Sequence, residues 1–356
     1  MDLDKTKLTD DALSLLQKLI ETPSLSKEEE LSAKLLEDFF NSRSIPLNRM
    51  GNNVWALNKY FDATLPTILL NSHHDTVKPN QGYLRDPYKA IIEDGKLFGL
   101  GSNDAGGSLV SLITSFAYFY DKKIPYNLIL AATAEEEISG KNGIESLLPK
   151  LPELHLAIVG EPTLLQMAVA EKGLLVIDAV VKGKAGHAAR DEVENAIYKA
   201  LDDLNLIKNY RFKKQSAYLG ENKVTATLIN SGSQHNVVPD ICTYTLDVRV
   251  TDAYSLEEAL EELSQVLKAE LQPRSLRLNS STITPDHKIL RVANNLGLNF
   301  YGSPTLSDQA LIPFPSVKIG PGDSARSHTA DEFIYLDEVA QGIDLYINLL
   351  NTYFNN

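Results

Sequence analysis

The chain has 356 residues, of which 43% are hydrophobic and 23% charged, a composition that favours a folded protein of about two domains and excludes a disordered chain. The formal net charge of -13 disfavours nucleic acid and anionic membranes as partners and favours a small molecule or another protein. The single cysteine, Cys242, excludes an internal disulfide, and the sequence shows neither a signal peptide nor the ~18 apolar residues of a membrane span, so we expect a cytoplasmic protein.

The first part of the chain alternates between predicted helices and short apolar strands. Apolar residues at helical spacing predict amphipathic helices at residues 9–21 and 27–40. Strand-length apolar runs and one further helix, at residues 107–119, come next. The strands are expected at residues 67–70, 128–132, 154–159 and 317–319. This alternation predicts an α/β architecture with a buried, mostly parallel sheet.

A region of different pattern begins at Gly173. Its predicted order is strand, helix, strand, strand, helix, strand, a β-α-β-β-α-β unit long enough to fold alone. These elements are expected at residues 174–181, 193–207, 223–229, 242–250, 256–271 and 275–279. Afterwards the first pattern resumes and ends in a helix at residues 336–353. We therefore expect one domain formed by residues 1–172 and 282–356, with an α+β domain, residues 173–281, inserted into it.

Clusters of acidic residues and histidines stand where several predicted strands end. Ligand sites in open α/β sheets gather at the carboxyl ends of the strands, so this placement favours a site. The clusters are Ser72-His73-His74-Asp75, Glu135-Glu136-Glu137, Gly160-Glu161-Pro162-Thr163 and Ser327-His328, and a Gly-rich turn adds Gly99-Leu100-Gly101-Ser102-Asn103-Asp104.

The first cluster suggests a histidine that is oriented by a carboxylate. Residues two apart in an extended chain point the same way, so His73 and Asp75 can face one site while His74 points elsewhere. A carboxylate on the far ring nitrogen fixes the tautomer of a metal-bound imidazole. Taken alone, two histidines beside an aspartate are more often a packed or solvated loop.

The three consecutive glutamates follow a strand predicted at residues 127–133. Adjacent carboxylates usually lie in solvent, and at a buried strand end they repel one another unless a cation neutralises them. Neighbours in an extended chain point to opposite sides. One glutamate can therefore bind a metal ion while the other meets the water that attacks a substrate.

The Gly-rich turn allows two interpretations. Residues 101–108 resemble a phosphate-binding loop, but Gly107 stands where that motif requires lysine. The alternative, which we favour, is that the glycines let the chain turn into the next helix and present Asp104. Together the clusters offer imidazole and carboxylate ligands without thiolate, which suit Zn²⁺, Co²⁺ or Mn²⁺ in a catalytic site that holds water.

In this order the motifs resemble the M20 family of metallopeptidases, in particular its acetylornithine deacetylase and succinyl-diaminopimelate desuccinylase branch. The resemblance runs essentially from end to end. Besides the clusters above, it is carried by Asp86-Pro87-Tyr88, Asp94-Gly95-Lys96-Leu97-Phe98, Gly186-His187, Asn236-Val237-Val238-Pro239, Asp247-Val248-Arg249, Ser307-Asp308 and Gly320-Pro321-Gly322.

The resemblance implies a zinc-peptidase catalytic domain with a pair of divalent ions, Zn or Co, with Mn as an alternative. Asp104 would bridge the two ions. His73 and Glu161 would complete the coordination of one ion, and Glu137 and His328 that of the other.

The resemblance also implies the residues of catalysis and substrate binding. Glu136 would be the general base, and Asp75 the partner of the metal-bound histidine. The inserted domain would act as a lid and as the surface of a homodimer. From it, His187 would stabilise the developing oxyanion, while Asn236 and Arg249 would bind the substrate, Arg249 through a carboxylate.

The implied reaction is removal of the acyl group from a small N-acylated amino acid. N-acetylornithine, in arginine biosynthesis, is the first choice; acetylcitrulline, succinylornithine, succinyl-diaminopimelate and dipeptides are the alternatives. A metal-binding protein without catalysis is disfavoured, because it has no use for Glu136. The sequence departs from the family pattern at Glu135, where Asp is usual, at His74, where Thr or Met is common, and at Leu100, where Arg is usual. His74 and Leu100 adjoin the metal-binding turns and bear on which acyl group fits.

Overall fold

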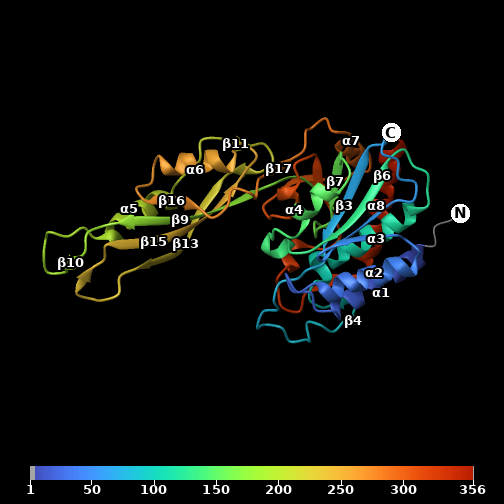
Figure 1. Ribbon diagram of the computed structural model, residues 1–356, viewed down its shortest axis with the longest axis horizontal. Coiled ribbons are helices and arrows are strands. Elements are labelled where there is room, and N and C mark those ends of the chain that lie inside the picture. Colours follow the sequence, from blue (N-terminus) through green and yellow to red (C-terminus); the bar gives the residue numbers. More distant parts are fainter. Residues whose placement is uncertain (1–4, 356) are drawn as a thin grey trace. The chain divides into compact units, whose positions relative to one another are not determined.

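The computed structural model describes residues 5–355, which form two compact units (Figure 1). Unit 1 contains the chain up to Val169, Thr282–Tyr301, and the residues from Ser307 onward. Unit 2 contains Ala170–Ser281 and Gly302–Leu306. The division expected from the sequence lies close to this one, except that the short segment Gly302–Leu306 also belongs to unit 2.

Unit 1 is built on a mixed sheet of nine strands, which confirms the predicted α/β class with a mostly parallel centre. Its strand order is β1-β2-β6-β3-β7-β19-β8-β17, with β18 also paired to β8. The pairs β6–β3, β3–β7 and β7–β19 are parallel, whereas β1–β2, β2–β6 and β19–β8 are antiparallel. The strands are β1 (Asn48–Met50), β2 (Asn53–Leu57), β3 (Thr67–His73), β6 (Asn127–Thr133), β7 (Leu156–Val159), β8 (Met167–Glu171), β17 (Ser281–Thr282), β18 (Phe300–Ser303) and β19 (Ser316–Lys318).

The central strands are buried because helical segments cover both faces of the sheet. Every residue of β3, β6 and β7 is buried, as expected for parallel strands between two layers. Ile68 and Leu70 of β3 pack in the core shared with five helices, and Leu69 packs on the opposite face. The five helices are α1 (Lys5–Ile20), α2 (Glu30–Ser42), α3 (Gly107–Tyr120), α7 (Lys288–Asn295) and α8 (Leu336–Asn355), and the short α4 (Ile144–Leu147) lies on the Leu69 face.

Two small features of unit 1 hold loops near the sheet. The strands β4 (Ile91–Glu93), β5 (Lys96–Phe98) and β20 (Phe333–Tyr335) form an antiparallel sheet in the order β20-β5-β4. The rings of Phe98 and Phe333 contact each other across it, with centroids 5.4 Å apart and a tilt of 50°. The sheet therefore joins the segment that leads into the Gly-rich turn to the segment that follows His328.

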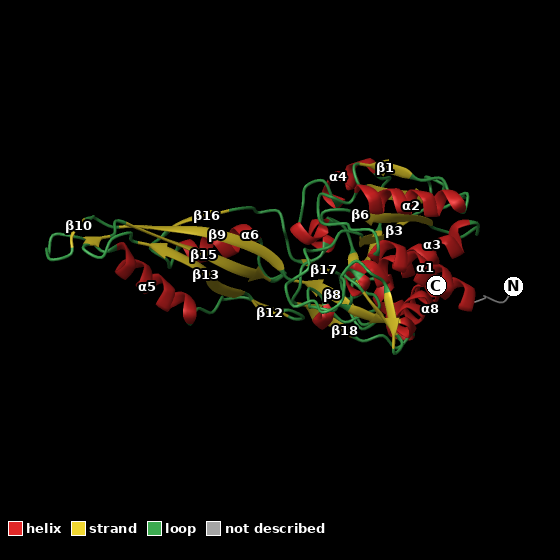
Figure 2. Cartoon of the chain, turned by 90° about the horizontal axis from the view of Figure 1, so that it is seen from below, coloured by secondary structure: helices red, strands yellow, loops and turns green. Residues whose placement is uncertain are grey.

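Unit 2 contains a four-stranded antiparallel sheet in the order β13-β15-β9-β16 (Figure 2). Along the chain the order is β9, α5, β13, β15, α6, β16, as the sequence predicts. The side chains of α5 and α6 share one apolar core with the inward residues of the sheet. The elements are β9 (Gly173–Lys182), α5 (Ala196–Lys208), β13 (Lys223–Ser231), β15 (Ile241–Val250), α6 (Leu256–Ser264) and β16 (Glu270–Pro273), with the short pairs β10 (Gly186–His187) with β14 (Val237–Val238) and β11 (Gln215–Ser216) with β12 (Gly220–Glu221).

The end of unit 2 differs from the sequence prediction. The helix predicted at residues 256–271 ends at Ser264, and the strand predicted at residues 275–279 lies at Glu270–Pro273 instead. Leu263, Leu267 and Leu271 continue at helical spacing, which extended the predicted helix. In the structure Leu271 packs on the core from a strand paired with β9, so tertiary pairing outweighs local periodicity.

No helix among residues 5–355 combines the length and the apolar character that a membrane span requires.

Candidate active site

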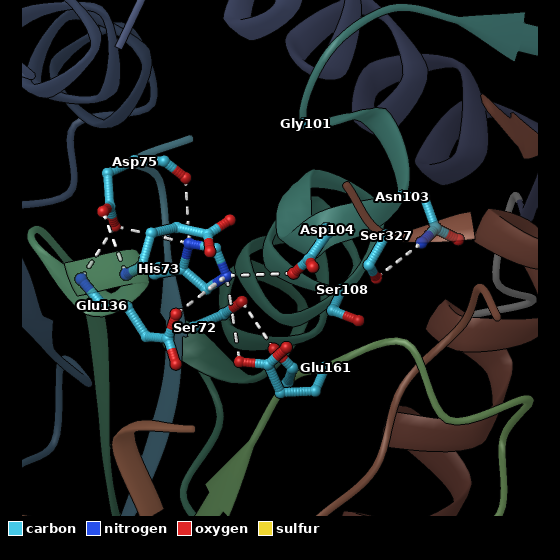
Figure 3. A network of polar contacts seen from close by, with 12 residues as sticks. Ser72, His73, Asp75, Gly101, Asn103, Asp104, Ser108, Glu136, Glu161 and Ser327 are labelled. Carbon is cyan, nitrogen blue, oxygen red and sulfur yellow. Dashed lines mark hydrogen bonds and ion pairs between the residues drawn. The ribbon is translucent and has the colours of Figure 1, made fainter. Parts of the chain in front are cut away.

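His73 is the centre of the candidate site in unit 1 (Figure 3). It is the last residue of β3, and its side chain is only 1% exposed. Its Nδ1 contacts the carbonyl oxygen of Asp75 at 3.0 Å, and its Nε2 lies 3.3 Å from Oδ1 of Asp104. Oxygens of Glu136 and Glu161 each lie 3.9 Å from the same Nε2. Carboxylates from three other segments therefore converge on one buried imidazole.

His74 points away from this site, as expected from the alternation of side chains in extended chain. Its Nδ1 lies 2.8 Å from Ser32 Oγ and its Nε2 lies 2.9 Å from the carbonyl oxygen of Asn52. Both ring nitrogens are thus used in packing the N-terminal part of the chain on β3.

Asp104 lies between the two predicted metal-binding histidines. The turn that carries it begins at Gly101, whose φ of +76° is the left-handed conformation that favours glycine. Oδ1 of Asp104 faces His73 at 3.3 Å, and Oδ2 lies 3.6 Å from Nε2 of His328. Ligand atoms of His73, Asp104 and Glu137 all lie within 4.8 Å of one another, which is close enough to hold a metal ion.

Glu136 and Glu137 lie on a short 3-10 turn, Glu136–Ile138, separated from the end of β6 by two residues, and they face different partners. Glu136 approaches His73, whereas Oε2 of Glu137 lies 2.9 Å from Nε2 of His328. The side chain of Glu137 is 7% exposed, in contrast to 55% for His328. His328 itself has a φ of +60° and follows the 3-10 turn Ser324–Arg326.

The turn that carries the two glutamates is held by side chains from other segments. Each of the four consecutive backbone N–H groups from Ala134 to Glu137 donates a hydrogen bond to one of these side chains. In chain order the acceptors are Asn53 Oδ1, Glu29 Oε1, Asp75 Oδ1 and Asp75 Oδ2, at 3.1, 3.3, 3.1 and 3.2 Å. Asp75 therefore connects His73 to the glutamate turn, a role that the sequence interpretation did not include.

Burial and mutual repulsion shift the pKa values of the cluster. Burial raises the pKa of Glu136 well above its usual value and that of Glu161 to about 8, against the opposing charge of His73. Burial would lower the pKa of His73, but its contacts with Asp104 and Asp75 outweigh burial and raise it well above its usual value. The hydrogen bond with Glu137 raises the pKa of His328 to about 9. The cluster thus concentrates negative charge that a cation would neutralise.

The donor set fits a divalent metal. It offers two imidazoles and several carboxylates, the ligand types used by catalytic Zn²⁺, Co²⁺ and Mn²⁺ sites. The chain's one cysteine, Cys242, is buried in the core of unit 2 and contributes nothing to this set.

Sequence reasoning missed two buried acidic residues next to the site, Glu29 and Glu332. Glu29 accepts a hydrogen bond from the glutamate turn, and Glu332 accepts hydrogen bonds from the Gly-rich turn. A single acid in a polar stretch gives no sequence signal of burial. The sequence indicated that Glu332 lies near the site only through its position four residues after the predicted ligand His328.

The three remaining predicted residues belong to unit 2. His187 lies on β10, which pairs with β14, and the next residue, Ala188, donates its N–H to the carbonyl oxygen of Asn236 at 3.0 Å. Arg249 lies near the end of β15 and donates two hydrogen bonds to Asp247, at 2.9 and 3.1 Å. The structure therefore groups His187 with Asn236 and places Arg249 separately.

Several known proteins are similar to this chain. A model of the peptidase family M20/M25/M40 matches residues 69–352. A succinyl-diaminopimelate desuccinylase of Wolbachia pipientis is 23% identical, covering 97% of this chain and 94% of its own length. An acetylornithine deacetylase of Buchnera aphidicola is 24% identical, covering 90% and 92%.

Solved structures share the fold. The aminopeptidase PepT of Bacillus cereus superposes with a TM-score of 0.79 at 18% identity, covering 97% of this chain and 98% of its own. A protein of Bacillus subtilis described as a dinuclear metal-binding peptidase of the M20 family has a TM-score of 0.74 at 16% identity, covering 98% and 99%.

Proposed function

The chain belongs to the peptidase family M20/M25/M40 and is a hydrolase that acts on amide bonds, and we propose that it removes the acyl group from a small N-acylated amino acid with the help of two divalent metal ions. The observation that carries this proposal is the orientation of Asp104, whose two carboxylate oxygens face His73 and His328 separately. A carboxylate in this position can bind two ions at once. The solved relative described as a dinuclear metal-binding peptidase supports the same conclusion.

Five side chains would hold the metals. Asp104 would be shared, His73 and Glu161 would serve one ion, and Glu137 and His328 the other. We expect Zn²⁺ or Co²⁺, with Mn²⁺ as the alternative, because imidazole and carboxylate suit all three.

Glu136 is the proposed general base. When bound, divalent ions supply Lewis acidity that lowers the pKa of water and polarises a carbonyl group. Glu136 takes a proton from the attacking water and returns it to the leaving amine. Its burial supports this role, because burial raises the pKa of the carboxyl toward the range in which a base can also act as an acid.

Unit 2 would supply the contacts to the rest of the substrate. His187 is the proposed donor to the oxyanion that develops on the carbonyl. Asn236, beside it, would bind the substrate as well. Arg249 would bind a carboxylate through its planar guanidinium, which Asp247 already holds in place with two hydrogen bonds.

The strand register of unit 2 sets Arg249 apart from His187 and Asn236. On β15, Arg249 pairs with Leu174, whereas Ile241, the residue nearest to β14, pairs with Lys182 at the other end of β9. At about 3.4 Å per residue, roughly 25 Å separates the two ends of the strand. We therefore propose that a second copy supplies either His187 and Asn236 or Arg249.

A surface for a second copy is available on unit 2. The strand β13 lies at the edge of its sheet, where unpaired backbone groups can bind another strand. It exposes Leu228 and Ile229 at 57% and 51%, and α5 exposes Tyr198 at 69%. These features support a homodimer formed through unit 2.

Complementation tests this arrangement. The variants His187→Ala and Glu136→Gln should each lose most of the activity alone. Mixed under conditions that exchange subunits, they should recover part of the activity, because the intact His187 of one chain would serve the intact Glu136 of the other. Absence of recovery despite proven exchange would place His187 in the site of its own chain.

N-acetylornithine is the proposed substrate, and succinyl-diaminopimelate is the second candidate because relatives of both names cover nearly the whole chain. Metal analysis should find close to two divalent ions per chain. Release of acetate or succinate from the two compounds, with added Co²⁺ or Zn²⁺, would identify the acyl group. Cleavage of dipeptides alone would contradict a deacylase and indicate a peptidase of the same family.

A further inference from the structure

Glu332 is a buried carboxylate whose two oxygens are both used by one turn. The residue is 2% exposed. Its Oε1 accepts hydrogen bonds from the backbone N–H groups of Asn103 and Asp104 at 2.8 and 2.9 Å, and its Oε2 accepts from that of Gly101 at 3.1 Å. Its carbonyl oxygen also accepts from the N–H of Gly99 at 3.0 Å. Glu332 therefore accepts hydrogen bonds from the backbone N–H groups of four of the six residues from Gly99 to Asp104.

The same segment carries His328, so Glu332 joins the two loops that face each other across the site. Asn103 strengthens this junction: its Oδ1 accepts from the N–H of Asp323 at 3.0 Å, and its Nδ2 donates to the carbonyl oxygen of Asp323 at 3.0 Å. The turn of Asp104 and the loop of His328 are therefore fixed to one another at two points.

A carboxylate is required at this position for a physical reason. Hydrogen bonds to an ionised acceptor are roughly twice as strong as neutral ones, and a carboxylate accepts on both oxygens. A glutamine would accept on one oxygen only and would turn an NH₂ group toward a backbone N–H, so one donor would lose its partner. Burial and the nearby charge of Asp104 raise the pKa of Glu332 to about 8, and the three backbone hydrogen bonds oppose this rise because they favour the ionised carboxylate.

We propose that Glu332 is a positioning residue, which aims the two oxygens of Asp104 at the two metal positions by holding the backbone of its turn. This inference rests on the proposed metal-dependent function and adds to it a residue that contacts neither metal nor substrate. The expected consequence is that Glu332 controls metal affinity through Asp104, and does more than stabilise the fold.

The test compares Glu332→Gln with a matched control in unit 2. Glu262 is also a buried carboxylate with three donors: Tyr210 Oη at 3.0 Å, the N–H of Lys213 at 3.3 Å and Tyr254 Oη at 2.9 Å. Both Glu262→Gln and Glu332→Gln should lower the melting temperature of the metal-free protein. Co²⁺ titration of both variants and of the unchanged protein, followed by visible absorption, then separates positioning from stability.

We expect Glu332→Gln to weaken Co²⁺ binding by about 10- to 100-fold, as for other residues that orient ligands, and to change the Co²⁺ spectrum. Glu262→Gln should leave both unchanged. If Glu332→Gln fails to fold, Glu332→Asp, which keeps the charge but shortens the reach, is judged by the same two measurements. Wild-type affinity and spectrum in a folded Glu332 variant would overturn the inference. Failure of the unchanged protein to bind Co²⁺ would instead overturn the proposed function.

Discussion

The two halves of the candidate metal centre are built differently. The buried half consists of His73, the last residue of β3, and Glu161, which follows β7; their side chains are 1% and 12% exposed. The other half, called the exposed half because of its histidine, consists of Glu137 and His328, which lie on turns; the His328 side chain is 55% exposed and that of Glu137 is 7% exposed. Asp104 faces both histidines.

The difference between the two halves gives the site both rigidly held ligands and an opening to solvent. The strands of the buried half pair with strands on both sides and every residue in them is buried, so its ligands are fixed in advance. The turns of the exposed half leave His328 open to solvent, where water and a substrate can enter. We expect the buried half to bind its ion more tightly and the exposed half to exchange its ion more readily.

Removal of each histidine should produce the largest effects and tests this asymmetry directly. His73→Ala should abolish activity and weaken binding of both ions, because the ring also packs against Asp75 and Asp104. His328→Ala should abolish activity as well but leave close to one ion bound. Metal analysis after dialysis would measure this, and equal losses of metal in the two variants would contradict the comparison.

The glutamate pair offers the next largest effect. Glu136→Gln should lower kcat by about 10² to 10⁴ while metal content stays unchanged, since it removes a general base that is not a ligand. Glu137→Gln should instead lose the ion of the exposed half. The reversed pattern, with metal lost in Glu136→Gln, would exchange the roles given to the two residues.

A smaller effect is expected at Asp75, whose carboxylate lies 3.4 Å from Nδ1 of His73 and accepts hydrogen bonds from the glutamate turn. Asp75→Asn should weaken metal affinity by about 10- to 100-fold. Competition with a chelator of known affinity would measure the change. Ser26→Ala is a matched control, because Ser26 donates to Asp75 at 2.7 Å but contacts no ligand; an equal loss in both variants would mean that the hydrogen bond of Ser26, and not the ring contact, sets the affinity.

The smallest effect concerns a residue outside both halves. Arg249→Lys should lower kcat/KM for the free-acid substrate by about tenfold, because lysine cannot reproduce a bidentate contact with a carboxylate. The loss should be much smaller for the α-amide of the same substrate. Similar losses for both compounds would show that Arg249 acts only through its bond to Asp247.

Sequence alone determined those features that depend on local pattern. The strands β3, β6 and β7 were predictable because a strand buried on both faces is a continuous apolar run. The segments of the site were predictable too, because polar clusters that follow such runs must emerge at one edge of the sheet. The spacing of apolar residues was misleading where it fitted both a helix and a strand. Leu271 is the example, because either element could bury its side chain.

Tertiary structure decided what depends on contacts between distant segments. No local pattern shows that each oxygen of Asp104 faces a different histidine, that Glu29 and Glu332 are buried against the turns of the site, or that Arg249 and Asn236 lie far apart in unit 2. The physical reason is the same in each case. How side chains from separate segments face one another is set by the packing of the strands and turns that carry them, and neither segment alone determines that packing.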